Sequence, residues 1–88
     1  MKTVYKYMLE TCDEQRVTMS TGAELLTVQV QHGVPCIWAR VDIDPLVPQV
    51  QRLIRMRGTG HQNANGVYVA TFQYQFGLVF HVFDGGEW

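Results

Sequence analysis

Residues 23–43, AELLTVQVQHGVPCIWARVDI, carry two alternating patterns of apolar and polar side chains with a break between them. Because successive side chains of a strand point to opposite faces, each half of this stretch predicts a strand with one apolar face. The break, His32-Gly33-Val34-Pro35, combines a glycine that tolerates positive φ with a proline that cannot donate to a ladder. The stretch therefore predicts an antiparallel hairpin. Its apolar faces are expected to hold Leu26, Val28 and Val30 on the first strand and Ile37, Ala39, Val41 and Ile43 on the second.

Alternation of the same kind recurs on both sides of the hairpin. Turn signals separate the segments, above all the two prolines of Asp44–Pro48 and the polar stretch Gly58–Gly66. A helix competes as an interpretation of residues 50–57, but the shortness of the segment and the closing glycine favour a strand. Residues 84–88 are expected to form a tail. The further strands are predicted at Thr3–Leu9, Arg16–Ser20, Val50–Arg57, Gly66–Gln75 and Leu78–Asp84, with Tyr68, Ala70, Phe72 and Tyr74 on one face of the fourth of these.

About seven short strands without a convincing helix predict one all-β domain over residues 1–88, a small antiparallel β-sandwich or barrel. The chain has 88 residues and is 47% hydrophobic, a large apolar load for its length. Because a domain of this size buries a limited share of its surface, the apolar load predicts a dense core, a subunit interface or both. We therefore expect a homo-oligomer.

Net charge and apolar runs exclude some classes of protein. The formal net charge of -1 argues against a general nucleic-acid binder, which would carry a basic surface. No apolar run approaches the length of a membrane span, and the N-terminus lacks the apolar core of a signal peptide. We expect a cytoplasmic protein with Cys12 and Cys36 as reduced thiols, without a membrane partner.

The polar faces of the predicted strands gather residue types that are common at binding sites. Arginine pairs with phosphate or carboxylate through two parallel hydrogen bonds, and tryptophan offers a stacking surface. A solvated sheet face, with Arg40 paired to a neighbour, is the alternative interpretation. The expected set comprises Gln29, Gln31, Trp38, Arg40, Asp42, Arg55 and Arg57, joined by His81 if the last strand contributes.

Gly58-Thr59-Gly60-His61 is the nearest feature to a motif. Glycines let successive backbone N–H groups converge on an anion, although an ordinary hairpin loop has the same composition. Neither a Walker loop nor a dinucleotide fingerprint is present. The three histidines lack metal-ligand spacing, and no nucleophile–base pair is visible. We therefore predict no enzyme, no cofactor and no metal.

Several segments resemble a group of short, mostly uncharacterised proteins encoded by tailed phages and prophages. The most specific are VQVQHGVPCIWA, GTGH and LVFHVF, and the resemblance covers nearly the whole chain. Met8 stands where a proline is expected, and the segment after Asp44 is more divergent. The resemblance implies expression in the cytoplasm of a bacterial host. Small phage proteins of this kind are often counter-defence factors, and the family supplies no catalytic residues.

The leading expectation is a phage counter-defence protein that works by binding, an oligomer that sequesters a nucleotide-derived signalling molecule. The alternatives are an inhibitor of a host defence protein, resembling an anti-CRISPR and anchored by Trp38 or Trp88, and a structural phage protein that only self-associates. The predicted ligand-binding residues are Trp38, Arg40, Arg55, Arg57, Thr59, Gly60 and His61.

Overall fold

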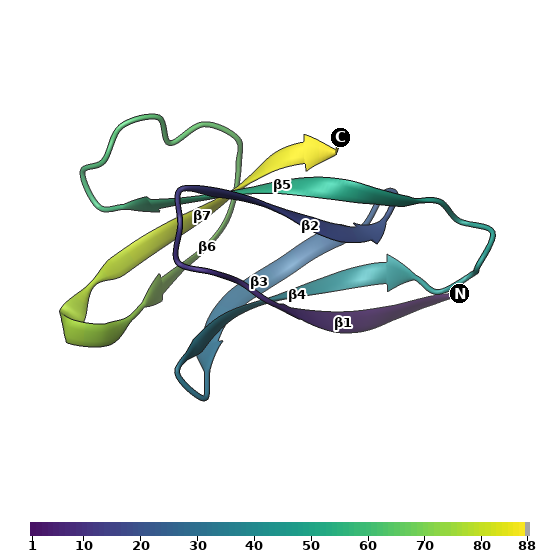
Figure 1. Ribbon diagram of the computed structural model, residues 1–88, viewed down its shortest axis with the longest axis horizontal. Helices are drawn as coiled ribbons and strands as arrows, with labels where there is room; N and C mark the ends of the chain where they lie inside the picture. Colours follow the sequence, from purple (N-terminus) through teal and green to yellow (C-terminus); the bar gives the residue numbers. More distant parts are fainter. Residues whose placement is uncertain (88) are drawn as a thin grey trace.

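The computed structural model describes residues 1–87, which form seven strands in two antiparallel sheets (Figure 1). The two sheets face each other across an apolar interior, so the all-β prediction is confirmed. The helix that competed for residues 50–57 does not form, because this segment is a strand in the middle of a sheet. The strands are β1 (Lys2–Met8), β2 (Glu14–Ser20), β3 (Glu24–Gln31), β4 (Val34–Asp42), β5 (Gln49–Gly58), β6 (Val67–Gln73) and β7 (Val79–Glu87).

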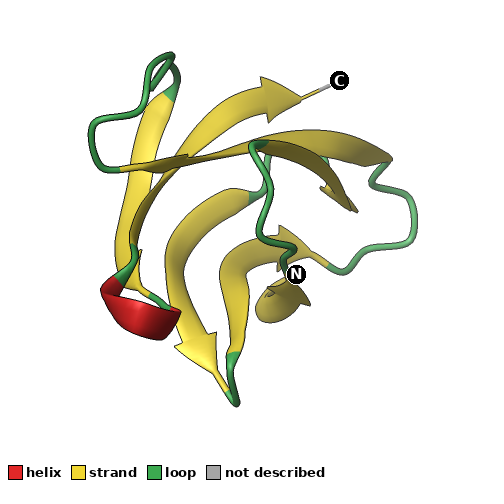
Figure 2. Cartoon of the chain, turned by 60° about the vertical axis from the view of Figure 1, so that its left-hand side comes forward, coloured by secondary structure: helices red, strands yellow, loops and turns green. Residues whose placement is uncertain are grey.

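The strands divide unequally between the two sheets. The smaller sheet has the order β1-β4-β3 and the larger has the order β2-β5-β7-β6, and all neighbouring strands are antiparallel. A short 3-10 turn, Gln75–Gly77, joins β6 to β7 and is drawn in red in Figure 2. This turn and the long loop after β5 lie at the same end of the molecule, on the left in Figure 1.

The predicted hairpin forms from β3 and β4. Its turn contains only His32 and Gly33, both with positive φ (53° and 79°), as the two-residue turns of twisted hairpins require. Val34 and Pro35, expected in the connection, instead begin β4. Pro35 lacks an N–H, but its carbonyl accepts a hydrogen bond of 2.8 Å from the backbone N–H of Leu9. The connection is therefore shorter than the sequence predicted.

Inward-facing side chains of both sheets form the core. Ile37 and Ala39 on β4 and Ile54 on β5 are fully buried, as the alternation of their strands predicts. Because both sheets are packed on this core, their other faces point outward on opposite sides of the molecule. The main cluster comprises Leu9, Val28, Ile37, Ile54, Met56, Ala70, Phe72 and Val82, and a second comprises Met19, Ala23, Ala39 and Val41.

Extra residues in the strands correct part of the predicted face assignment. The register of β3 shifts between Leu25 and Thr27, and Leu25, rather than Leu26, packs against both core clusters. The register of β6 shifts in the same way at Val69, so Tyr68 leaves the face of Ala70 and is 58% exposed. A bulge adds one residue to a strand and reverses the faces beyond it. At strand ends Val30 and Ile43, also predicted inside, are 37% and 42% exposed.

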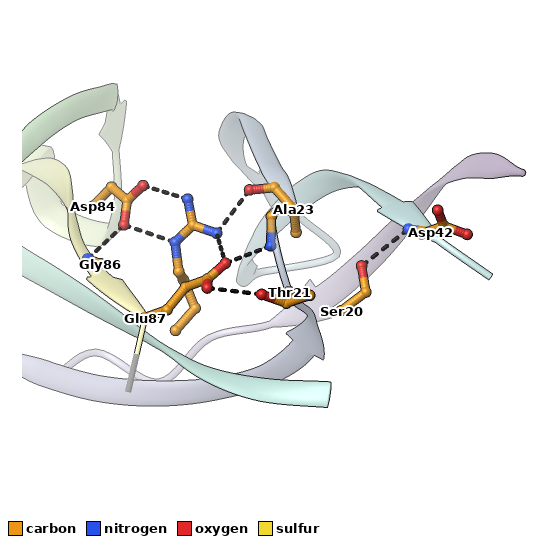
Figure 3. A network of polar contacts seen from close by, with 9 residues as sticks. Ser20, Thr21, Ala23, Asp42, Asp84, Gly86 and Glu87 are labelled. Carbon is orange, nitrogen blue, oxygen red and sulfur yellow. Dashed lines mark hydrogen bonds and ion pairs between the residues drawn. The ribbon is translucent and has the colours of Figure 1, made fainter. Parts of the chain in front are cut away.

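The expected C-terminal tail is part of β7 up to Glu87, and Trp88 lies outside the described residues. A polar cluster, which we call the clasp, fastens this end of the chain to the turn between β2 and β3 (Figure 3). Arg52 on β5 donates to both carboxylate oxygens of Asp84 at 2.9 and 2.6 Å and to the carbonyl of Ala23 at 2.7 Å. Glu87 accepts hydrogen bonds from the hydroxyl of Thr21 and the N–H of Gly22.

The hydrogen bonds of the clasp lower the pKa of two of its carboxyl groups. The hydrogen bond from Arg52 holds the pKa of Asp84 below its ordinary value. The N–H of Gly22, with the hydroxyl of Thr21, lowers the pKa of Glu87 in the same way. The ionised carboxylates are therefore the forms that the folded chain favours.

Candidate ligand-binding site

The predicted site residues lie on both sheets, and the outward faces of these sheets point in opposite directions. Trp38 and Arg40 are on β4, in register with Lys6 and Val4 of β1. Trp38 is half-buried, and Arg40 donates to Glu24 at 2.7 Å in an exposed ion pair. The five remaining predicted residues belong to the larger sheet: Arg55 and Arg57 are on β5, and Thr59, Gly60 and His61 directly follow it. Trp38 therefore cannot stack on a small ligand that the same chain holds with Arg55 and Arg57.

Arg57 has a structural role in the folded chain. Its residue surface is 9% exposed, and its guanidinium donates to the carbonyls of Asp13 and Met56. The same guanidinium lies 3.5 Å from the carboxylate of Glu14. Arg57 therefore fixes the connection between β1 and β2, with little surface left for a ligand.

Arg55 is more accessible, with a side chain that is 26% exposed. It lies 3.3 Å from Glu14 and donates to the carbonyl of Asn65 at 3.3 Å. Both arginines therefore use the same carboxylate, so the cluster of Arg55, Arg57 and Glu14 has two positive charges and one negative. This surplus of positive charge favours the binding of an anion on the outward face of the larger sheet.

The segment Gly58-Thr59-Gly60-His61 is a tight turn. The N–H of His61 donates to the carbonyl of Gly58 at 3.1 Å, and Gly60 has φ +86°. This N–H is therefore engaged within the turn and cannot bind an anion as the sequence suggested. The imidazole of His61 lies over Gly58, where a Cβ atom would be 2.8 Å from Cε1. Gly58 is therefore required by the close approach of this ring.

A cleft of about 470 Å³ lies between this turn and the connection from β6 to β7. Thr59 and His61 contribute its polar groups, and Leu78 and Phe80 contribute apolar surface. Its volume is within the range of small-molecule sites. The ring of His61 also borders a smaller cavity of about 90 Å³ beside Cys12 and Asp13. Of the predicted residues, the structure thus brings Thr59 and His61 to one cleft.

A row of four hydrogen-bonded side chains continues from Thr59 across the larger sheet. The hydroxyl of Thr59 is 2.8 Å from Nε2 of His81, and Nδ1 of His81 is 2.9 Å from the hydroxyl of Thr71. The hydroxyl of Thr71 is in turn 2.8 Å from that of Tyr68. We call these residues the hydroxyl row. Arg57, His81 and Thr71 are neighbours in register on β5, β7 and β6.

Sequence reasoning missed most of the hydroxyl row. It placed His81 on this face only conditionally and grouped Tyr68 with the apolar face of Ala70 and Phe72. It placed Thr71 on the opposite face without predicting it as a site residue. Pairing the strands around the turn at Gln75–Gly77 would have placed Thr71 opposite His81. The bulge at Val69, which turns Tyr68 outward against Phe83, has no comparable signal in the sequence.

A second, wider cleft of about 770 Å³ lies between β1 and β2 and contains none of the predicted residues. Its walls carry charges of both signs, including Lys6, Glu10 and Glu14. The carboxamide of Gln15 pairs with both backbone groups of Glu10, which ties the two walls together. Burial raises the pKa of the Cys12 thiol, which disfavours the reactive thiolate there.

Neither a metal centre nor a membrane helix is found in the described part of the chain. Within residues 1–87 no group of three or more histidine, cysteine, aspartate or glutamate side chains is placed to hold a metal ion. Over the same residues there is no helix long and apolar enough to cross a membrane.

Comparison with known proteins gives one match. No curated protein and no solved structure matches the chain. Residues 1–87 match a family described as a domain of unknown function, DUF7352. The match covers nearly the entire sequence, and the chain therefore belongs to the DUF7352 family.

Proposed function

We propose that this protein binds a small anionic molecule of the nucleotide class and works by sequestering it rather than by catalysing a reaction. The observation that carries the proposal is the position of Thr59. This residue lines the cleft beside Leu78 and Phe80 and also begins the hydroxyl row. The apolar cleft and the polar row thus share Thr59, and Arg57 of the positively charged cluster is the neighbour in register of His81 in that row.

The spacing of these features suits a nucleotide. A flat ring would fit against the apolar wall of Leu78 and Phe80, with His61 at its side. A phosphate would lie toward Arg55, four residues before Thr59. At a rise of about 3.3 Å per strand residue, these two positions are roughly 13 Å apart, which matches an extended nucleotide with its phosphates.

Binding is favoured over catalysis by the engagement of His81. Both of its ring nitrogens already have threonine hydroxyls as partners. A general base needs a ring nitrogen that faces the substrate proton. In this arrangement the imidazole positions two hydroxyls and is better suited to recognition.

The biological setting follows from the resemblance to proteins of tailed phages and prophages. We propose that the chain acts in the cytoplasm of a bacterial host, where it removes a nucleotide-derived signal of the host defence. Self-association is part of this proposal. Exposed apolar side chains on the smaller sheet, Val4 at 50% and Met8 at 73%, lie on the same face as Trp38 and would be covered in an oligomer.

The same apolar face favours the second candidate, an inhibitor that covers a host defence protein. Trp38 would then be an anchor, since tryptophan is enriched at binding hot spots. The two candidates use opposite faces of the molecule, so substitutions on each face distinguish them.

The test begins with mass spectrometry of small molecules released from protein purified from bacteria whose defence signalling is active. The second step is calorimetric titration with a panel of adenosine and guanosine mono-, di- and cyclic nucleotides. Leu78→Glu places a negative charge in the cleft and should weaken nucleotide binding at least about tenfold, which is about 1.4 kcal/mol. Leu46→Glu is the matched control, because Leu46 is 88% exposed and lies in the loop between β4 and β5.

Equal affinities for the parent and Leu78→Glu would exclude the cleft. Co-purification of a host protein with the parent and with Leu78→Glu but not with Trp38→Ala would support the inhibitor as the function in place of sequestration. Absence of any bound nucleotide in both steps would reject sequestration outright.

A further inference from the structure

The hydroxyl row consists of neutral groups that both donate and accept hydrogen bonds. Thr59, Thr71 and Tyr68 each contribute a hydroxyl, and the imidazole of His81 joins them through its two nitrogens. A hydroxyl has one donor and two acceptor lone pairs, so each of the three hydroxyls keeps unused hydrogen-bonding capacity, while both ring nitrogens of His81 are engaged. The row therefore offers a ligand several adjacent donors and acceptors without a full charge.

The row is accessible from solvent. Tyr68 is 58% exposed, and Thr59 and Thr71 are exposed on the outward face of the larger sheet. Contacts between exposed side chains contribute little to stability, and their hydroxyl hydrogens can rotate toward a new partner. The row can therefore exchange internal contacts for contacts with a ligand at small cost to the fold.

The chemistry of the row fits sugar hydroxyls better than phosphate. A phosphate offers only acceptors and is bound best by cations, of which Arg55 is the nearest accessible example. A sugar hydroxyl needs both a donor and an acceptor, and the three hydroxyls of the row are groups of both kinds. The ring of Tyr68 meets that of Phe83 edge to face, with centroids 6.0 Å apart, and adds aromatic surface for the apolar side of a sugar.

We infer that the hydroxyl row binds the ribose hydroxyls of the ligand and so selects ribonucleotides over their deoxy analogues. This inference rests on the proposed binding of a nucleotide and specifies which part of it the row recognises. A site built to bind a hydroxyl discriminates strongly against an analogue that lacks it, because its polar groups then lose their partner. Since the row is exposed, water replaces part of the loss, and we expect about a tenfold preference for the ribonucleotide.

The test compares adenosine and guanosine diphosphates with their 2′-deoxy and 3′-deoxy analogues by calorimetry. The parent should bind the ribonucleotide of one base about tenfold more tightly than at least one deoxy analogue. Thr71→Val and Tyr68→Phe each remove one hydroxyl from the row and keep the shape of the side chain. Each should reduce the preference at least threefold, because it weakens binding of the ribonucleotide more than binding of the deoxy analogue.

Thr18→Val is the matched control, because Thr18 is an exposed threonine on β2 of the same sheet and lies outside the row. It should keep the full preference. If ribonucleotides and deoxy analogues bind the parent equally, the inference is wrong and the proposed function stands. If no nucleotide binds, the proposed function fails and the inference fails with it. A variant that weakens all ligands equally would assign the row a structural role instead.

Discussion

The two polar clusters along β5 differ in how completely their groups are paired. In the clasp, the side chain of Arg52 is 12% exposed, and its guanidinium has two carboxylates and a carbonyl as partners. At the other end of the strand, Thr59 and His81 join neutral groups in a row that is open to solvent. One cluster is thus closed and charged, and the other is open and neutral.

This difference separates stabilisation from recognition. A partly buried ion pair with paired hydrogen bonds cannot accept a ligand without breaking, and removal of one partner leaves a charge uncompensated. Exposed hydroxyls lose little when their partner changes. Arg52, which the sequence analysis left outside the predicted site, thus has a structural role. The hydroxyls of Thr71 and Tyr68, also left out, are the better candidates for recognition.

The largest expected effect comes from Arg52→Met, which removes the guanidinium and keeps most of the apolar length. Asp84 then loses both charged hydrogen bonds, and the carbonyl of Ala23 loses its donor. Hydrogen bonds to charged groups contribute about 1.5–3 kcal/mol, so we expect the free energy of unfolding to fall by about 2–4 kcal/mol. Urea denaturation at neutral pH measures this loss.

Arg55→Met is the matched control on the same strand. Arg55 pairs with Glu14 at 3.3 Å, and the Glu14 side chain is 51% exposed, so this pair should contribute less than about 1 kcal/mol. Equal losses from the two substitutions would show that the clasp is no stronger than a surface ion pair.

A smaller effect is expected from acid, which protonates the carboxylates of the clasp. Arg52 depresses the folded-state pKa of Asp84 below the unfolded value of about 3.9. The stability from this group is therefore fully present above that value and is lost as the pH falls through the folded-state pKa. Glu87, whose pKa is lowered by Gly22 and Thr21, adds to the same trend.

Urea denaturation between about pH 2 and 7 checks this dependence. Asp84→Asn should be less stable than the parent at pH 7, and its stability should vary less with pH. If the stabilities of the parent and of Asp84→Asn change in parallel with pH, the acid sensitivity belongs to other groups. Asp42 is one such group, because a hydrogen bond from the backbone N–H of Asp44 lowers its pKa.

The sequence was sufficient to predict the strands, because the alternation of apolar and polar residues and the turn residues are local properties. The hairpin, the position of β5 and the burial of Ile37, Ala39, Ile54 and Met56 all followed from them. Alternation assigns a residue to a face but does not say to which sheet that face belongs. For this reason the sequence grouped Trp38 with Arg55 and Arg57, which the two sheets separate.

Pairing between segments that are distant in the sequence accounts for the other differences between the predictions and the structure. Arg57 was expected at a ligand, and its partners at Asp13 and Glu14 come from a connection more than forty positions away. Residues 84–87 contain two glycines and were expected to form a tail. Contacts of Gly86 and Glu87 with Leu53 and Arg52 instead keep them in β7. Such partners depend on the assembled fold and leave no periodic signal.

The smallest expected effect concerns Phe76, which lies in the turn beside the cleft. The residue is 97% exposed, and its backbone has φ +59° and ψ 29°. A left-handed conformation costs a residue with a Cβ atom roughly 1–2 kcal/mol, and asparagine tolerates it best after glycine. The exposed ring contributes almost no burial to offset this cost. We therefore expect Phe76→Asn to raise the free energy of unfolding by about 0.5–1 kcal/mol.

Phe76→Ala separates the backbone from the ring, because alanine keeps the Cβ atom and loses only the exposed ring. Its stability should stay within about 0.5 kcal/mol of the parent. If Phe76→Ala stabilises the chain as much as Phe76→Asn does in urea denaturation, the backbone is not the cause of the cost. If both destabilise it, the ring has a packing role that its exposure hides. If Phe76→Asn alone raises the free energy of unfolding, backbone strain is stored in the turn beside the cleft. The clasp, by contrast, stabilises the fold.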